Sequence, residues 1–314
     1  MLTRCIARSF STAAPKSVAF IGLGDMGMPM AINLAKNNFK VSGVDLSAAN
    51  LEEAEANGIT PVGSIKEACS NVDFVVTCLP KKHDILGAHL DADGVLASVQ
   101  PNTVVMDAST VTPMVVREIG EHAEEKGIVF CDSPLGGGGV WAAKRGALVF
   151  MVGAKNEEHF EKAKVCLAGM GNKFFHCGPV GNGQAVKISH NLTLAIHMIA
   201  SAEGMVLGEK LGIDPLVLME ILQVSTAANP CNGIYNPRPG NYPDSAASRN
   251  YERGFKTDLM KKDLSLAIEA AEYIGANVDI AKKAHDFYDQ VSAAGYGDKD
   301  FGYVYQYILK DFKI

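Results

Sequence analysis

The chain has 314 residues, 47% of them hydrophobic and 20% charged, with a formal net charge of −6. This length suggests about two domains, and the lack of a basic cluster argues against nucleic-acid binding. The best candidate for a membrane span, 192–202, is short and contains His197. The composition therefore favours a globular enzyme that binds neither nucleic acid nor membrane.

The first sixteen residues, MLTRCIARSFSTAAPK, contain Arg4 and Arg8 and no acidic residue, the first acid being Asp25. Their apolar core is too short for a secretory signal. A basic, acid-free leader with serine and threonine is typical of mitochondrial transit peptides. We predict that residues 1–16 are such a peptide, with a disordered tail as the alternative.

The cysteines and histidines indicate no metal or disulfide framework. The seven cysteines are odd in number and form no C-x-x-C pair, and the eight histidines lack metal-ligand spacing. We therefore expect reduced thiols and no metal cofactor.

Residues 18–45 read as strand, glycine turn, helix and second strand. Val18 to Ile21 is a short apolar run fit for a strand buried on both faces. The turn has the form G-x-G-x-x-G, in which the glycines permit a tight turn, close approach of a pyrophosphate and close helix packing. The predicted cofactor-binding residues of this turn are Gly22, Leu23, Gly24, Asp25, Met26 and Gly27.

Asp45 ends the second predicted strand, 18 residues after Gly27. A carboxylate there would accept hydrogen bonds from the ribose hydroxyls and repel a 2′-phosphate. We therefore predict NAD as cofactor rather than NADP. A methyltransferase-like nucleotide site is the alternative.

Further apolar runs predict strands at 73–78, 103–107, 128–132 and 148–152, alternating with helices. This pattern predicts an α/β fold, with a doubly wound parallel sheet in a Rossmann domain over residues 17–178. The segments that leave the strands, 79–84, 108–110 and 133–139, should line the ligand cleft.

A glycine corner at 178–183 precedes a proline-free run, 184–211, that predicts a long helix bridging to an all-helical domain over 179–314. Lys187 and Asn191 are four residues apart, so both point from one face toward the sheet edge. A lone lysine on a helix is usually solvated, but apolar neighbours make a buried, chemically tuned ammonium the alternative.

The rest of the chain predicts helices at 215–224, from 258 to Gly275, at 280–294 and at 301–312. The second of these should bury Met260, Leu264, Ala267, Ala271 and Ile274. Lys262 lies off that stripe, which suggests exposure to solvent. The segment 225–254 has no evident element, which suggests a functional or interface loop, with disorder as the alternative.

Four motifs in this order resemble the 3-hydroxyisobutyrate dehydrogenases of the β-hydroxyacid dehydrogenase family. They are Phe20-Ile-Gly-Leu-Gly-Asp-Met-Gly27, Asp132-Ser-Pro-Leu-Gly-Gly-Gly138, Gly178-Pro-Val-Gly-Asn-Gly-Gln-Ala-Val-Lys-Ile-Ser-His-Asn191 and Lys262-Asp-Leu-Ser-Leu-Ala267. The resemblance covers almost the whole chain after the leader. The loop at 235–240 resembles the branched-acid enzymes more than their glyoxylate-reducing relatives.

The resemblance implies the roles of individual residues. Lys187 is the implied catalytic acid or base, and Asn191 assists it. Contacts on the nicotinamide side are implied at Leu79, Pro80, Asp84, Thr110 and Lys262. The substrate carboxylate is expected at Ser109 and in the glycine-rich loop, at Gly136, Gly137 and Gly138.

The chain departs from the family pattern at three places. Gly136 or Gly137 stands where relatives carry a carboxylate-binding serine, one extra residue precedes Trp141, and Pro230 stands where relatives carry a tryptophan. Backbone N–H groups could still hold a carboxylate. Loss of the hydroxyl donor should weaken or widen substrate choice by about 1 kcal/mol or more.

The resemblance implies NAD-dependent oxidation of 3-hydroxyisobutyrate to methylmalonate semialdehyde in valine catabolism, within the branched-chain amino acid pathways. We expect a homo-oligomer, a dimer or tetramer, in the mitochondrial matrix. One alternative is a reductase of a small semialdehyde or glyoxylate; Asp45 argues against it because such reductases commonly use NADPH. The other is a catalytically silent dinucleotide-binding protein, against which Lys187 argues.

Overall fold

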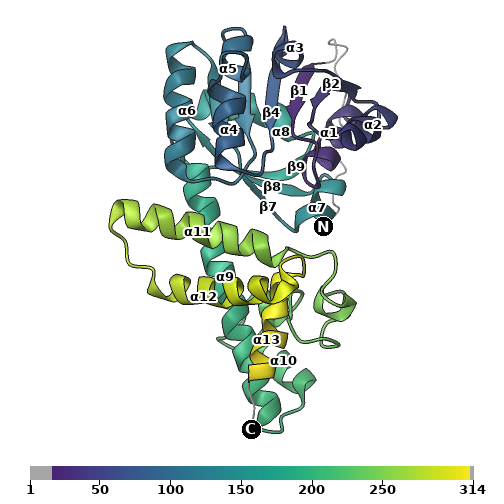
Figure 1. Ribbon diagram of the computed structural model, residues 1–314, viewed down its shortest axis with the longest axis vertical. Helices are drawn as coiled ribbons and strands as arrows, with labels where there is room; N and C mark the ends of the chain where they lie inside the picture. Colours follow the sequence, from purple (N-terminus) through teal and green to yellow (C-terminus); the bar gives the residue numbers. More distant parts are fainter. Residues whose placement is uncertain (1–15, 312–314) are drawn as a thin grey trace, which may run out of the picture.

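The structure is a computed structural model that describes residues 16–311. The predicted transit peptide therefore lies outside the described residues, apart from Lys16. In Figure 1 an α/β domain lies above an all-helical domain, and α9 (Asn182–Lys210) passes from one into the other. The predicted fold class, a Rossmann domain followed by helices on a long bridging helix, is confirmed.

The sheet of the upper domain is centred on β1, which pairs in parallel with β2 on one side and β4 on the other. Its strand order is β3-β2-β1-β4-β5-β6-β8-β7, with β9 paired to β8. The strands are β1 (Ser17–Ile21), β2 (Lys40–Val44), β3 (Thr60–Pro61), β4 (Phe74–Thr77), β5 (Val104–Asp107), β6 (Val129–Asp132), β7 (Leu135–Gly136), β8 (Leu148–Ala154) and β9 (Gly171–His176). The order reverses between β1 and β4, where open sheets of this kind bind ligands.

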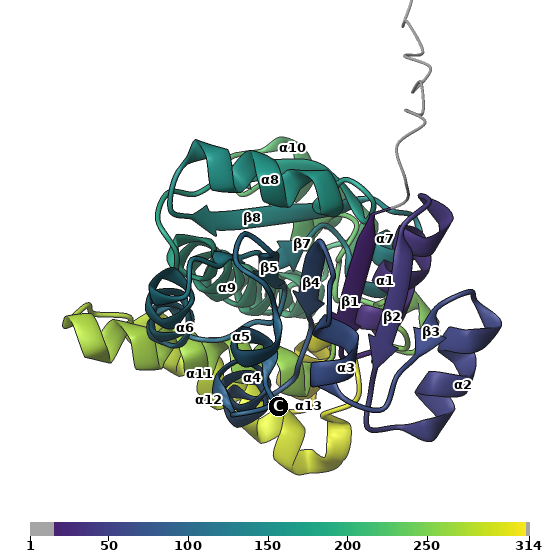
Figure 2. The same ribbon diagram turned by 90° about the horizontal axis from the view of Figure 1, so that it is seen from above.

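Helices cover both faces of this sheet. They are α1 (Gly27–Lys36), α2 (Ala48–Ala56), α3 (Ile65–Cys69), α4 (Lys82–Leu90), α5 (Val95–Ser98), α6 (Pro113–Glu125), α7 (Gly139–Lys144) and α8 (Glu157–Leu167). Figure 2 shows α8 on one side of the strands and α4 and α5 on the other. Phe20 packs in one core and Ala19 in the other, which explains why central strands such as β1 and β4 are runs of apolar residues.

One strand differs from the sequence prediction. The segment around 148–152 was predicted as a further parallel strand, but β8 runs antiparallel to β6, with Asp132 opposite Gly153. The connection from β6 turns back through β7, which also pairs antiparallel with β8. Gly137, Gly138 and Gly139 have φ values of +104°, +119° and +59° at this reversal, a conformation that glycine adopts without strain. The glycine loop therefore reverses the chain where a parallel crossover was expected.

The lower domain is helical, as predicted. Besides α9 it contains α10 (Pro215–Val224), α11 (Thr257–Ile274), α12 (Asp279–Val291) and α13 (Val304–Asp311). Its core joins Met198 and Met205 of α9 to Leu264, Tyr288 and Tyr305 of the other helices. Among residues 16–311 no helix is long and apolar enough to cross a membrane.

The helical domain departs from the sequence prediction at one residue and orders a segment for which no element was predicted. Ile274 was expected in the buried stripe of α11, but it is 72% exposed. It is the last residue of the helix and precedes Gly275, which has a φ of +72°. At this end the helix extends beyond the residues it packs against. The segment 225–254 is ordered by turns and contains two short 3-10 helices, at Pro230–Asn232 and Ala247–Arg249.

Candidate active site

The glycine turn after β1 has the shape that a dinucleotide needs. A Cβ at Gly22 would lie 2.3 Å from the Cys78 carbonyl oxygen, and one at Gly27 would lie 1.9 Å from the Gly22 carbonyl oxygen. At Gly24 a Cβ would meet nothing within 4 Å, so there the loop borders open space. No side chain caps the start of α1, which leaves its first N–H groups available to a diphosphate.

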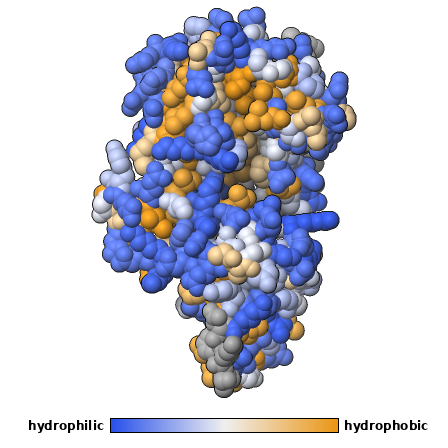
Figure 3. All heavy atoms as spheres, in the orientation of Figure 1, coloured by the Kyte–Doolittle hydropathy of each residue, from blue (hydrophilic) through white to orange (hydrophobic). Residues whose placement is uncertain are grey.

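Figure 3 shows apolar residues gathered over β1 and β4 on the face of the upper domain. The strand order reverses between these two strands, and open sheets bind ligands at the carboxyl edge of such a point.

Asp45 lies directly after β2, as predicted, and its carboxylate already has three partners. Oδ2 accepts a hydrogen bond from the Leu23 N–H at 2.7 Å. Oδ1 accepts from the Ser47 N–H at 2.8 Å and from Asn50 Nδ2 at 3.1 Å. Asp45 thus fixes the glycine turn to the end of β2, and Oδ2 keeps a lone pair for a further donor such as a ribose hydroxyl.

The loops after β4 and β5 are joined through Ser109. Its hydroxyl donates to Asp107 Oδ1 at 2.6 Å and accepts from the Leu79 N–H at 2.9 Å. Ser109 is only 3% exposed, so the structure uses this hydroxyl to position the two loops. Of the other predicted contacts here, Pro80 is exposed, and Asp84, in the first turn of α4, lies 3.0 Å from His83 Nε2.

The start of α9 is attached to the sheet edge by Asp132. Its Oδ1 accepts from the Gly181 N–H at 2.7 Å and its Oδ2 from the Gln184 N–H at 2.8 Å. Burial raises the pKa of Asp132 to about 6, although these N–H groups lower it. The Gln184 side chain then holds the β5 loop, since Nε2 donates to the Ser109 carbonyl oxygen at 2.8 Å. These contacts fix the orientation of the helix that carries Lys187.

Lys187 is half-buried on α9 and its ammonium makes no hydrogen bond or ion pair within residues 16–311. Burial lowers its pKa, while the charge of Asp263 raises it and that of Lys262 lowers it. Burial therefore favours the neutral amine of Lys187 more than exposure to water would. The alternative of a chemically tuned ammonium therefore describes Lys187 better than a solvated charge.

Asn191 is 2% exposed and its orientation is fixed from two sides. Nδ2 donates to Asp263 Oδ2 at 2.5 Å, and Oδ1 lies 2.8 Å from His190 Nδ1. An amide nitrogen carries two hydrogens, so one N–H of Asn191 remains for a ligand.

Lys262 joins the two domains. Its ammonium donates to the Thr110 carbonyl oxygen at 3.1 Å and lies 3.4 Å from Asp263 Oδ1. The prediction that Lys262 is exposed to solvent is therefore only partly correct. Its side chain is 36% exposed, but its ammonium contacts the loop after β5. Of the predicted residues, Asn191 and Lys262 contact one carboxylate, that of Asp263, whose charge also acts on Lys187.

That carboxylate, Asp263, was missed by the sequence analysis. It is 4% exposed and touches Asn191 and Lys262. A signal was present: on a helix, residue 263 shares a face with Met260 and Ala267, and an acid within a buried stripe needs a polar partner.

The glycine loop is open on its outer side. Gly137, Gly138 and Gly139 are exposed, and Trp141 beside them is 63% exposed. The Trp141 ring stacks under the Arg145 guanidinium at 4.5 Å. The serine missing from this loop leaves only backbone donors at Gly136 to Gly138.

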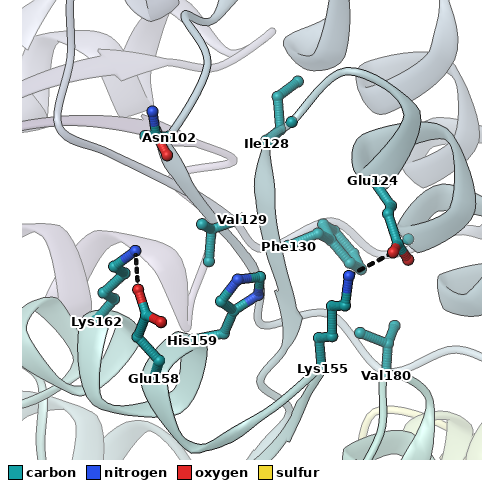
Figure 4. Close-up of a pocket in the computed structure, with 12 residues that line it drawn as sticks. Asn102, Glu124, Ile128, Val129, Phe130, Lys155, Glu158, His159, Lys162 and Val180 are labelled. Atoms are coloured by element: carbon teal, nitrogen blue, oxygen red, sulfur yellow. Dashed lines mark hydrogen bonds and ion pairs between the residues drawn. The ribbon is translucent and has the colours of Figure 1, made fainter.

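Two cavities lie elsewhere. One of about 290 Å³, shown in Figure 4, lies at the opposite edge of the sheet, where Lys155 pairs with Glu124 and Lys162 with Glu158; its charges are already balanced. Another of about 720 Å³ follows the outer face of α9, and His190, the partner of Asn191, is in its wall.

The chain matches two family models. Residues 17–178 match the NAD binding domain of 6-phosphogluconate dehydrogenase, and residues 181–308 match the NAD-binding domain of NADP-dependent 3-hydroxyisobutyrate dehydrogenase. These matches and the glycine turn establish a nicotinamide dinucleotide, NAD(P), as the cofactor.

Individual relatives cover nearly the whole chain. A probable mitochondrial 3-hydroxyisobutyrate dehydrogenase of Dictyostelium discoideum is 39% identical over 98% of this chain and 95% of its own length. An NAD-dependent L-serine dehydrogenase of Pseudomonas aeruginosa is also 39% identical, over 92% of this chain and 96% of its own. The solved structure of Mycobacterium tuberculosis 3-hydroxyisobutyrate dehydrogenase with L-serine has a TM-score of 0.89 and 36% identity, covering 94% of this chain and 99% of that one. The chain therefore belongs to the 3-hydroxyisobutyrate dehydrogenase family of NAD(P)-dependent hydroxyacid oxidoreductases.

Proposed function

We propose that this protein oxidises 3-hydroxyisobutyrate to methylmalonate semialdehyde with NAD, as a step of valine breakdown. The observation that carries the proposal is the half-buried, unpaired Lys187 beside Asn191 and Asp263, at the edge of the sheet that carries the glycine turn. Residues 17–178 hold the dinucleotide in this proposal, and residues 179–314 supply the proton-transfer group.

Alcohol oxidation requires one group to remove the hydroxyl proton while a hydride leaves the same carbon. When bound, the nicotinamide ring accepts that hydride. Lys187, as the neutral amine, takes the hydroxyl proton. The lowered pKa of Lys187, caused first by burial, increases the fraction of amine at neutral pH.

The neighbours of Lys187 have positioning roles in this proposal. The free N–H of Asn191 orients the substrate hydroxyl, because Asp263 holds the other one. Lys262, hydrogen-bonded to the Thr110 carbonyl oxygen, keeps the helical domain against the sheet edge. In this proposal Leu79, Pro80 and Asp84 lie on the nicotinamide side of the site.

The substrate carboxylate is held by the N–H groups of Gly136, Gly137 and Gly138, while Ser109 positions the adjoining loop. Without a serine hydroxyl this site discriminates less between small 3-hydroxy acids. L-Serine is the second candidate substrate, since a 39% identical relative is named an L-serine dehydrogenase. It shares the primary alcohol and carboxylate of 3-hydroxyisobutyrate and carries an amino group in place of a methyl group.

Asp45 supports NAD over NADP. Its carboxylate stands at the end of β2 with Oδ2 partly free, and a 2′-phosphate would bring a second negative charge to it. Asp45→Arg should raise kcat/KM for NADP relative to NAD.

We further propose a homo-oligomer in the mitochondrial matrix. Four apolar side chains of α10, Leu216, Val217, Ile221 and Val224, are 47% to 88% exposed, and a patch of this kind is typical of subunit contacts. Light scattering would give the oligomeric state, and an import assay with residues 1–16 fused to a reporter would test the address.

The decisive experiment is an initial-rate panel of 3-hydroxyisobutyrate, L-serine, 3-hydroxypropionate and glycerate, each with NAD and NADP. We expect the highest kcat/KM with 3-hydroxyisobutyrate and NAD. The highest kcat/KM with L-serine would make L-serine the substrate, and a preference for NADP over NAD would support the reductase alternative. No turnover with any pair would support a catalytically silent dinucleotide-binding protein.

A further inference from the structure

A buried polar network lies under the loops that we assign to the nicotinamide. Asp107 and Thr77 are the last residues of β5 and β4, are paired in register, and are both 0% exposed. Asp107 Oδ1 accepts hydrogen bonds from Thr77 Oγ1 at 2.7 Å, from Ser109 Oγ at 2.6 Å and from the Ser109 N–H at 3.2 Å. Three donors on one oxygen are the surroundings of an ionised carboxylate.

The proton positions in this network follow from the donors. Thr77 gives its only hydroxyl proton to Asp107, so at 3.1 Å it must accept from His89 Nε2. His89 is 0% exposed, and burial lowers its pKa although Asp107 raises it. His89 is therefore the neutral tautomer with its hydrogen on Nε2, and it brings no positive charge to Asp107.

The negative charge of Asp107 is incompletely balanced. Asp107 Oδ2 and His89 Nδ1 are buried without a hydrogen-bond partner in the described part of the chain. No ion pair of Asp107 occurs among residues 16–311. Burial of an unpaired charge is costly. This cost indicates that the Asp107 carboxylate has a function at this edge of the sheet.

The charge acts on the loop where the nicotinamide is expected. Ser109, held by Asp107, accepts the Leu79 N–H. At Cys78, the residue before Leu79, the thiol pKa is raised to about 12, first by burial and then by the charge of Asp107, while Lys262 acts to lower it. Asp107 and Lys262 thus bring opposite charges to the same short segment.

We propose that the Asp107 carboxylate sets the preference of the site between the two redox forms of its cofactor. It favours the positively charged oxidised nicotinamide over the neutral reduced ring, because a buried charge acts through a low dielectric. Lys262 opposes it. This inference rests on the proposed function only in placing the nicotinamide at Leu79, Pro80 and Thr110.

Asp107→Asn isolates the charge. An asparagine keeps an oxygen for the three donors at Oδ1, and its amide nitrogen takes the place of Oδ2, which has no partner to lose. Dissociation constants of the purified full-length protein are measured without hydroxy acid, for NADH by its fluorescence and for NAD⁺ by competition. We expect the Kd for NAD⁺ to rise roughly tenfold relative to that for NADH. An equal change in both constants, or none, would overturn the proposal and leave Asp107 a scaffold for the loops.

Thr77→Val is the matched control, since it removes a hydrogen-bond donor and keeps the carboxylate. The ratio of the two constants should stay at the wild-type value, and a shift as large as that of Asp107→Asn would count against an electrostatic origin. If Asp107→Asn does not fold, Lys262→Gln tests the same field with the opposite sign. Lys262→Gln should lower the Kd for NAD⁺ relative to that for NADH, and an unchanged ratio of the two constants would contradict the proposal.

These measurements are separate from those on the proposed function. A wild-type protein that binds both dinucleotides but oxidises no hydroxy acid would refute the proposed function and still permit the binding test. A protein that turns over substrate, with a ratio that Asp107→Asn leaves unchanged, would refute this inference alone.

Discussion

The two halves of the site are held in different ways. On the sheet edge, backbone N–H groups hold much of the arrangement: that of Leu23 holds Asp45, that of Leu79 holds Ser109, and those of Gly181 and Gln184 hold Asp132. Asp107 adds side-chain contacts to Thr77 and Ser109 beneath them. On the helical side, Asn191 and Lys262 meet the Asp263 carboxylate, so side chains hold one another.

This difference separates the effects expected from substitutions. Backbone partners stay in place when a side chain changes, so the sheet edge should respond in cofactor binding and stability. On the helical side, one lost charge changes the pKa of its neighbours, so substitutions there should change kcat and its pH dependence.

The largest effect is expected at Lys187. Lys187→Ala should lower kcat by roughly 10²-fold or more, since acid–base catalysis contributes about 10² to 10⁴, with NADH binding nearly unchanged. Lys187→Arg should be almost as damaging, because a guanidinium keeps its proton. Lys210→Ala, at the exposed end of the same helix, is the control. A Lys187→Arg enzyme with near wild-type kcat and an unmoved pH profile would show that the base lies elsewhere.

The next effect concerns stability and Asp132. Burial raises its pKa to about 6, above the value of about 3.9 in an unfolded chain. The native state therefore binds the proton more tightly, so this group contributes stability that is complete below pH 4 and is lost as the pH rises through 6. The loss is on the order of 3 kcal/mol for a shift of this size.

Urea unfolding at pH 4.5 and 7 tests this. The difference in the free energy of unfolding between the wild type and Asp132→Asn should decrease from pH 4.5 to pH 7. Asp300→Asn should behave alike, because burial also raises the pKa of Asp300 to about 6, while that residue lies in the helical core. A difference that does not vary with pH would mean that Asp132 titrates like an exposed carboxyl.

Much of the sheet-edge half could be predicted because its signals are local in sequence. The glycine turn and Asp45 lie within one βαβ unit. A position without room for a Cβ, such as Gly27, requires glycine, so the local sequence itself shows the turn. The helix bounds also followed from caps and breakers: Asp214 accepts the Leu216 N–H and Gly275 ends α11.

The rest depended on contacts between distant residues. The direction of β8 follows from how the loop of Gly137 to Gly139 reverses, which strand propensity does not encode. The contact of Lys262 with Thr110 spans 152 residues. Ile274 fits the apolar period of α11 but lies beyond the core. The period of a helix does not show where its contacts with other elements end, so its exposure could not be predicted.

A smaller effect on kcat is expected at Asp263. Asp263→Asn removes the charge that raises the pKa of Lys187 and weakens the contact with Asn191. The rising limb of kcat/KM for alcohol oxidation should move to lower pH, and kcat should fall by about tenfold, the cost of losing one charged hydrogen bond. Asp289→Asn, which removes the exposed partner of Lys261, is the control. A fall in kcat with the pH profile unchanged would assign Asp263 a purely structural role.

The smallest effect is expected at Lys82, which offers a second charged link between the domains. Its ammonium lies 3.8 Å from Glu269 of α11, and the two side chains are 56% and 51% exposed. Exposed pairs contribute about 0 to 1 kcal/mol, so Lys82→Ala should leave kcat and KM within about twofold of the wild type. Lys262→Ala, which removes the half-buried link to Thr110, should change KM for the cofactor far more. If Lys82→Ala lowered kcat/KM as strongly as Lys262→Ala, the domains would be held by exposed charge, and raising the ionic strength should then reproduce the defect in the wild type because salt screens such pairs.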